Sequence, residues 1–171
     1  GTVLLGPNVW CYSFFFSKAC SPGSIHEVFS WVHALVCRVL CQFGVKAESV
    51  PLSDLAVSVH GTTPLKKLAG HAQKRTRFGV LCEGSLLAAP FPFPLGELLK
   101  PPPRQPPYRQ GRSHDAFLTD LCALTETEKN TAPPPGFPEF VQKLCQQLQV
   151  EAPSPLPEEI QKQAARFAGE K

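Results

Sequence analysis

The chain has 171 residues, a length that fits one domain and allows a sizeable buried core. Its net charge is only +3 and its basic residues are spread out apart from Lys74, Arg75 and Arg77, so we expect no nucleic-acid partner. No apolar run approaches the roughly 20 residues that cross a bilayer, so we expect no membrane segment.

The first part of the chain predicts a hairpin followed by a long helix. Residues 2–5 and 9–16 are rich in β-branched and aromatic side chains, so Gly6-Pro7-Asn8 predicts the turn between two antiparallel strands. Ser24 and Glu27 have the spacing of a capping box, and apolar residues then recur at helical spacing until Gly44. We therefore expect an amphipathic helix over residues 24–43.

The middle of the chain predicts four further strands, which would extend the hairpin into a mainly antiparallel sheet. They cover residues 45–47, 55–59, 65–69 and 79–88. The segments expected between them are Ser53-Asp54, a turn at residues 61–63 and the basic residues 74–77.

The last third predicts helices separated by Pro-rich stretches. A short helix over residues 95–99 precedes an extended, polyproline-like passage through residues 101–107. Ser113 then predicts the cap of a helix that runs through Phe117 and Leu121. The remaining predictions are a linker, rich in Thr, Pro and Gly, followed by helices over residues 137–148 and 157–168.

A lysine followed by small residues stands in the segment K-L-A-G-H-A. Lys67 precedes an expected turn at Gly70 to Ala72, and the neighbouring Lys66 must point to the other face of the strand. A fixed ammonium there can contact the carbonyl of an acyl group and a phosphate. Gly70 and Ala72 would let a ligand approach backbone N–H donors. By itself, the pattern is also that of a solvated lysine at a strand end.

Other small residues and histidines accompany this segment. Gly84 and Ser85 could likewise admit a ligand, or could belong to an ordinary turn. His71 is expected to form a pocket wall or to lie on the surface, because no carboxylate or cysteine stands at the spacing of a triad or a metal site. His26 and His33 should share a face of the long helix, without further ligands. We predict no metal-ligating residues.

Several of these segments follow one another in the order of a known family. Gly1, Thr2 and Val3 are similar to the end of R-R-x-x-G-G-G-x-V, residues 67–72 to K-[IVL]-x-G-x-A, and residues 84–87 to the G-[ST]-L-L strand. Residues 108–121 are similar to a further segment that ends in F-x-T-N-L. In this order they resemble the catalytic domain of the lipoate-protein ligase A and octanoyltransferase group, within the biotin/lipoate ligase family.

The resemblance implies an α+β fold, with a mainly antiparallel sheet flanked by helices, like that of class II aminoacyl-tRNA and biotin synthetases. It also implies an N-terminally truncated chain, because the paired arginines of the family motif would precede Gly1. Residues 1–124 are then expected to form a partial catalytic domain and residues 125–136 a linker. Residues 137–171 would form a helical segment that packs on the same domain.

The resemblance further implies attachment of a lipoyl or octanoyl group to a lysine of a lipoyl carrier domain, through an acyl-adenylate made from ATP with Mg²⁺. The carrier would belong to a 2-oxoacid dehydrogenase complex or be the glycine cleavage H protein. Lys67 would be the catalytic residue. The substrate and nucleotide would be bound by Gly1, Thr2, Val3, Leu4, Gly70, His71, Ala72, Gly84 and Ser85. We expect a monomer, in the cytoplasm or an organelle matrix, since the seven cysteines lack a C-x-x-C pair.

Two alternatives stay open. An ATP-independent octanoyltransferase would carry the acyl group on a cysteine, but residues 46–54 contain none, and Cys37, Cys41 and Cys82 are expected to be small buried hydrophobes. A non-catalytic acyl-binding homologue is the second alternative. It is favoured by Glu83, where the family commonly has His, and by Asp120, where Asn is usual. The arginines 104, 109 and 112 could meet an acidic carrier domain or solvate a loop, and the loop is favoured.

Overall fold

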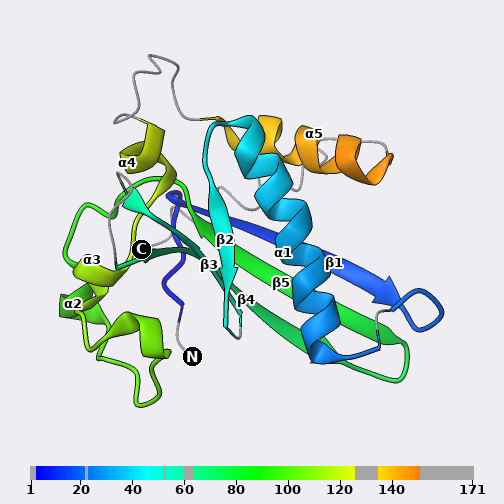
Figure 1. Cartoon of the computed structure of the whole chain (residues 1–171), viewed down its shortest axis with the longest axis horizontal. Coiled ribbons are helices and arrows are strands. Elements are labelled where there is room, and N and C mark those ends of the chain that lie inside the picture. Colours follow the sequence, from blue (N-terminus) through cyan, green and yellow to red (C-terminus); the bar gives the residue numbers. More distant parts are fainter. Residues whose placement is uncertain (1–2, 22, 52, 60–63, 126–134, 151–171) are drawn as a thin grey trace, which may run out of the picture.

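The computed structural model describes residues 3–21, 23–51, 53–59, 64–125 and 135–150. Its centre is a five-stranded sheet in the order β1-β5-β4-β3-β2, and all neighbouring strands are antiparallel (Figure 1). The strands are β1 (Val9–Ser17), β2 (Ala47–Val50), β3 (Asp54–Val57), β4 (Lys66–Arg75) and β5 (Gly79–Leu87). The expected α+β class is therefore confirmed.

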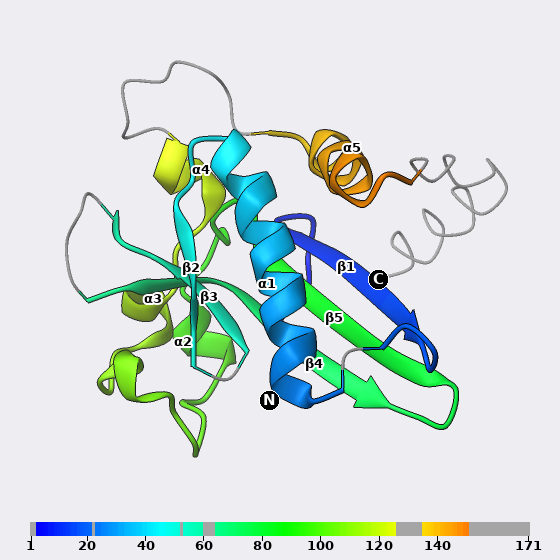
Figure 2. The same cartoon turned by 45° about the vertical axis from the view of Figure 1, so that its right-hand side comes forward.

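The helices divide between one face of the sheet and one end of it (Figure 2). The long helices α1 (Ile25–Gln42) and α5 (Phe137–Leu148) pack on the same face. Near the start of β4 lie the short elements α2 (Leu95–Leu98), η2 (Pro107–Arg109), α3 (His114–Phe117) and α4 (Leu121–Thr125). In the part of the chain that the structure describes, no helix is both long and apolar enough to cross a bilayer.

Helix α1 forms where the sequence predicts it. The Ser24 side chain accepts a hydrogen bond from the Glu27 backbone, and the Glu27 carboxylate accepts one from the Ser24 backbone, so the capping box is complete. Gly44 has a φ of 80°, a conformation that glycine adopts without strain and that lets the chain leave the helix. The apolar stripe of α1 is fully buried at Val28, Val32, Leu35, Val36, Val39 and Leu40.

The alternation of side chains along β1 separates the two faces of the sheet. Trp10, Tyr12, Phe14 and Phe16 face α1 and α5 and pack against the core. The opposite face of β1, β5 and β4 holds mostly small or polar side chains, and we call it the open face. Its members include Cys11, Ser13, Ala72, Glu83 and Ser85, all exposed or half-buried.

Several predicted elements are corrected by the structure. Residues 3–5 are not in a strand, although a turn does precede β1. The expected turn at Gly70 to Ala72 is wrong, because β4 continues through it to Arg75. The helix expected from Ser113 to Leu121 is divided into α3 and α4, because residues 118 and 119 instead pair with β4. Helix α5 has the predicted bounds, whereas the helix expected over residues 157–168 lies outside the described residues.

Candidate functional site

A bulge in β4 determines where the side chain of Lys67 lies. The pairing between β3 and β4 shifts between Leu55 and Ala56, so that β4 contains one extra residue. An extra residue reverses the alternation of side chains between the two faces. Lys67 and Gly70 therefore share a face although they are three positions apart. The lysine amine lies over Gly70, where an added Cβ would be only 2.8 Å from Nζ.

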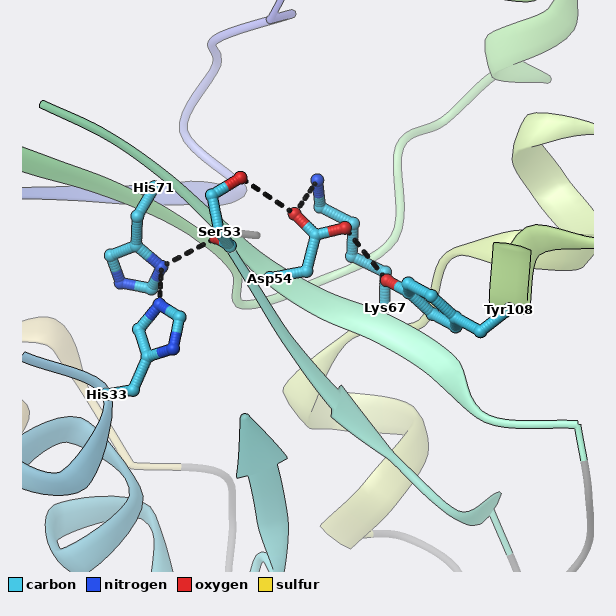
Figure 3. A network of polar contacts seen from close by, with 6 residues as sticks. All are labelled: His33, Ser53, Asp54, Lys67, His71 and Tyr108. Carbon is cyan, nitrogen blue, oxygen red and sulfur yellow. Dashed lines mark hydrogen bonds and ion pairs between the residues drawn. The ribbon is translucent and has the colours of Figure 1, made fainter. Parts of the chain in front are cut away.

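The amine of Lys67 is held by a carboxylate from the neighbouring strand. Asp54 is the first residue of β3 and pairs with Gly70, so its side chain lies beside that of Lys67. The distance from Lys67 Nζ to Asp54 Oδ1 is 2.7 Å (Figure 3). The Lys67 side chain is 27% exposed and the Asp54 side chain 9%. The Lys67 side chain is therefore partly exposed, so a ligand could reach its amine from the exposed side.

A tyrosine of the Pro-rich segment binds the second oxygen of Asp54. The Tyr108 hydroxyl in η2 donates to Asp54 Oδ2 at 2.9 Å. Burial, followed by the negative charge of Asp54, raises the pKa of Tyr108 well above its usual value, so the hydroxyl stays protonated and remains a donor. Asp54 therefore has one oxygen on the lysine and the other on the tyrosine.

Two arginines fix the segment that carries Tyr108. Arg112 donates from Nη2 to the carbonyls of Leu65 at 2.8 Å and Tyr108 at 2.7 Å. The Nε groups of Arg109 and Arg112 each donate to the backbone carbonyl of the other residue, and both guanidinium groups lie over the Phe117 ring. Arg109 is buried and its Nη2 has no hydrogen-bond partner. The expectation that these two arginines solvate a loop is wrong, because they tie the loop to the sheet.

His71 lies on the α1 side of the sheet, not on the surface. Its Nδ1 lies 3.2 Å from both the Ser53 carbonyl and His33 Nε2 (Figure 3). Its Nε2 lies 2.8 Å from the Tyr12 hydroxyl. Burial is the main cause that lowers the pKa of His71 to about 3 and that of His33 to about 4. His26 and His33 lie seven positions apart in α1, and His26 is exposed whereas His33 is buried.

The remaining predicted site residues are distributed over both faces. Ala72 and Ser85 lie on the open face, with Ser85 paired to Gly70. Gly84 faces α1 instead, and the ring of Tyr12 fills the space where its Cβ would be. Val3 and Leu4 lie in an irregular segment ahead of β1, while Gly1 and Thr2 fall outside the described residues. Lys67, Gly70, Ala72 and Ser85 are therefore the predicted residues that share one face.

A shallow pocket with apolar and polar lining residues lies next to this site. The Lys67 carbonyl accepts a hydrogen bond from the Thr119 backbone at 3.0 Å, and Leu118 pairs with Lys67. Leu118 and Thr119 also line the pocket, whereas Lys67 itself does not. The pocket has a volume of about 150 Å³, and its other lining residues are Leu87, Ala89, Pro90, Phe91, Phe93, Leu95, Asp115 and Asp120.

Two residues of the site were not anticipated. Asp54 was expected only as part of a break between strands, and Tyr108 only as the start of a motif. An acidic residue at the start of a strand, with a lysine at the start of the next, is a signal that could have indicated Asp54. The partner of Tyr108 is 54 positions away in the sequence, so no local pattern indicates it.

Long helices on one face of an antiparallel sheet form the fold that this chain shares with solved lipoate and biotin ligases. The chain belongs to the family of lipoyl protein ligase A/B catalytic domains, whose family model matches residues 1–149. No curated protein sequence is significantly similar to the chain.

Solved structures share the fold at low sequence identity. A bi-partite lipoate protein ligase from Thermoplasma acidophilum, studied with its E2 lipoyl domain, is 17% identical with a TM-score of 0.60, over 96% of this chain and 61% of that one. A lipoate-protein ligase A bound with ATP is 16% identical with a TM-score of 0.55, over 96% and 62%. A mutant biotin protein ligase from Aquifex aeolicus, in complex with biotin, is 10% identical with a TM-score of 0.54, over 83% and 48%. The chain thus spans less than two thirds of these proteins.

Proposed function

We propose that the chain is a lipoate-protein ligase-like enzyme that attaches lipoyl or octanoyl groups to a lysine of lipoyl carrier domains. The observation that carries the proposal is the position of Lys67, whose amine lies over Gly70 on the open face and is fixed by Asp54. The family match over residues 1–149 supports it, and residues 67–72 resemble the K-[IVL]-x-G-x-A motif of that family. The solved ligase with its E2 lipoyl domain supports the carrier as partner.

Lys67 would stabilise negative charge on the acyl carbonyl oxygen and on the phosphate of an acyl-adenylate. Its amine is already oriented by one carboxylate, so little conformational freedom is lost when a substrate oxygen approaches. Tyr108 keeps Asp54 in place during this approach by its hydrogen bond to the other oxygen. Gly70, Ala72 and Ser85 put small residues on the open face near the amine. The adjacent pocket has apolar and polar lining residues, and its apolar side would take part of the acyl chain.

ATP and Mg²⁺ are part of the proposal, and the ATP-bound ligase of the same fold supports the nucleotide. Among the described residues, no cluster of three or more His, Cys, Asp or Glu side chains could hold a metal ion. Mg²⁺ needs only one or two carboxylates when phosphates supply its other ligands. Lys67 would be the cation for a phosphate, but Asp54 does not fit as the Mg²⁺ ligand, because Lys67 and Tyr108 already bind its two oxygens. Localisation in the cytoplasm or an organelle matrix and a monomeric state stay predictions.

The decisive experiment is pyrophosphate exchange into ATP, assayed with lipoate, octanoate and biotin. Wild-type protein should exchange with lipoate or octanoate, and Lys67→Ala should lower the rate by about 100-fold, the size typical of removing one group that stabilises developing charge. Lys66→Ala is the matched control, because Lys66 lies on the other face of β4, and it should keep the wild-type rate. Equal rates for wild type and Lys67→Ala would refute the role of the lysine.

An ATP-independent octanoyltransferase is the second candidate, and one cysteine favours it. Cys11 is exposed on the open face and pairs with Ser85, which pairs with Gly70. It therefore lies two strands, or about 10 Å, from the backbone under the Lys67 amine. Cys82, in contrast, is buried on the α1 side, where burial raises the pKa of its thiol to about 11. Acylation of Cys11 by an octanoyl thioester without ATP, lost in Cys11→Ser, would favour this candidate over the ligase.

A further inference from the structure

A chain of buried polar contacts runs from α1 to the turn that precedes β3. His33 Nδ1 lies 2.6 Å from Ser49 Oγ, and His33 Nε2 lies 3.2 Å from His71 Nδ1. His71 Nδ1 is also 3.2 Å from the Ser53 carbonyl, and Tyr12 lies 2.8 Å from His71 Nε2. His33 is 1% exposed and His71 8%. These contacts join α1, β1, β2 and β4 to one backbone carbonyl.

With both rings neutral, one arrangement of protons satisfies all of these contacts, and in it the single His71 Nδ1–H is shared between two acceptors. The Ser53 carbonyl can only accept, so His71 carries its proton on Nδ1 and its Nε2 accepts from the Tyr12 hydroxyl. His33 Nε2 then faces this N–H as an acceptor, and His33 Nδ1 donates to Ser49. Both rings are neutral in this arrangement, which agrees with the burial that lowers their pKa values.

The carbonyl that His71 holds belongs to the residue before Asp54. The Ser53 carbonyl accepts from the His71 backbone N–H at 2.8 Å as well as from the ring, so His71 binds it twice. Asp54 follows directly and points to the opposite face, where it binds Lys67. A displacement of Ser53 would therefore move the carboxylate that orients the amine (Figure 3).

We propose that His71, fixed by His33, is a positioning residue that sets the orientation of the Lys67 amine across the thickness of the sheet. It acts through the Ser53 carbonyl and Asp54, and touches no substrate. The functional importance of this arrangement rests on the proposed acyl transfer. The arrangement itself does not, because it concerns the state of one lysine amine and can be measured without substrate.

The test uses variants of His71 that retain or remove the side-chain donor to the Ser53 carbonyl. In His71→Asn the amide nitrogen takes the place of Nδ1 and can still donate to Ser53, whereas in His71→Gln the amide takes the place of Nε2 and cannot. The full chain of each variant is labelled with a trace of acetic anhydride, and acetylation at each lysine is measured by mass spectrometry. We expect Lys67 to react roughly fivefold faster in His71→Gln, the size of one lost ion pair, and at the wild-type rate in His71→Asn.

Internal and matched controls separate this effect from a general loosening of the fold. Lys66 and Lys74 should keep their rates in every variant. Leu144→Ala removes a buried side chain of α5 that makes none of these polar contacts, and it should lower the unfolding temperature without changing the rate at Lys67. Equal Lys67 rates in folded His71→Asn and His71→Gln would overturn the proposal, whether they are unchanged or both raised.

An activity assay links the inference to the proposed function. His71→Gln should lower kcat for acyl transfer while KM for the acyl substrate stays close to wild type, because the substrate contacts are intact. If the wild-type protein transfers no acyl group, the proposed function fails and the labelling result still decides the role of His71. If the wild type is active and labelling is unaffected by His71→Gln, the function stands and the positioning role fails.

Discussion

Two glycines on neighbouring strands make room for two different side chains, one on each face of the sheet. Gly70 in β4 lies under the amine of Lys67, and Gly84 in β5 lies under the ring of Tyr12. At both positions an added Cβ would clash with the side chain that lies over the glycine. The consequence of adding one differs, because a lysine amine ends a flexible stem whereas a buried aromatic ring is fixed by its neighbours.

Gly70→Ala should impair acyl transfer while leaving the fold almost as stable as wild type. The new Cβ would lie 2.8 Å from Nζ and 3.0 Å from Cε of Lys67, so the end of the side chain must move away from Asp54. A displacement of about 1 Å in a catalytic group can cost about 100-fold in rate. Steady-state transfer and thermal unfolding of the same preparations check this. An active Gly70→Ala variant would show that the amine tolerates displacement.

Gly84→Ala should give the opposite result, a loss of stability through strain in the core. Its Cβ would lie 2.4 Å from the Tyr12 ring, which is packed against Phe140 and bonded to His71. Overpacking of this kind costs about 1–3 kcal/mol of the free energy of unfolding. Urea denaturation measures it. A variant as stable as wild type would contradict the tight contact, and Gly96→Ala, with its nearest neighbour at 3.6 Å, is a control for the substitution.

Helix α1 forms through local rules and at the same time carries His33 into the buried network. Its start depends on the reciprocal hydrogen bonds between Ser24 and Glu27. The backbone and side chain of Ser24, in that order, hold the pKa of the Glu27 carboxyl below its usual value. The same helix buries His33 against Phe29 and His71. Its first turn therefore anchors an element whose middle supports the site.

Ser24→Ala should destabilise the protein by about 1 kcal/mol, the usual cost of losing an N-cap. The helix would begin with an unpaired backbone N–H, since no other side chain replaces the hydroxyl. The midpoint of urea unfolding measures the change. Ser30→Ala is the matched control on the same helix, because Ser30 is exposed in its interior and should leave stability unchanged or slightly raised.

Elements with local signals could be predicted from the sequence, and those that depend on pairing could not. The capping box and the Gly44 stop indicated α1, and the end of the linker with Pro138 in the first turn indicated α5. Gly70 was expected to mark a turn, but a glycine inside a strand can equally mark a close approach, which the sequence does not distinguish. Lys67 was found by its motif. Its partner Asp54 depends on the bulge that brings Lys67 over Gly70, and no local pattern specifies a bulge.

At the scale of the whole molecule, the two long helices and the sheet enclose a core that contains a neutral imidazole pair. His33 and His71 are the buried histidines among the described residues. The charged groups near them are Asp54, which raises the pKa of His33, and Lys67, which lowers that of His71. Both effects are smaller than that of burial. The fold is therefore coupled to the protonation of this pair.

The free energy of unfolding should fall as the pH falls below about 6.5. The pKa values of His33 and His71 are lowered in the folded state from 6.5 to about 4 and about 3. Between pH 6.5 and these folded values, both rings therefore bind protons when the protein unfolds. Stability from the pair is complete above the unfolded value of 6.5 and is lost as the pH falls towards the folded values. Each histidine contributes a slope of up to about 1.4 kcal/mol per pH unit.

Urea unfolding of the wild type at a series of pH values between about 7 and 5 gives this slope, before most carboxylates titrate. His71→Asn should remove about half of the slope, because one of the two buried imidazoles is gone while the hydrogen bond to Ser53 is kept. His33→Asn should do the same through the other ring. If both variants retain the full wild-type slope, the pair is not neutral in the folded protein, and the proton arrangement that links Tyr12 to Ser53 is wrong.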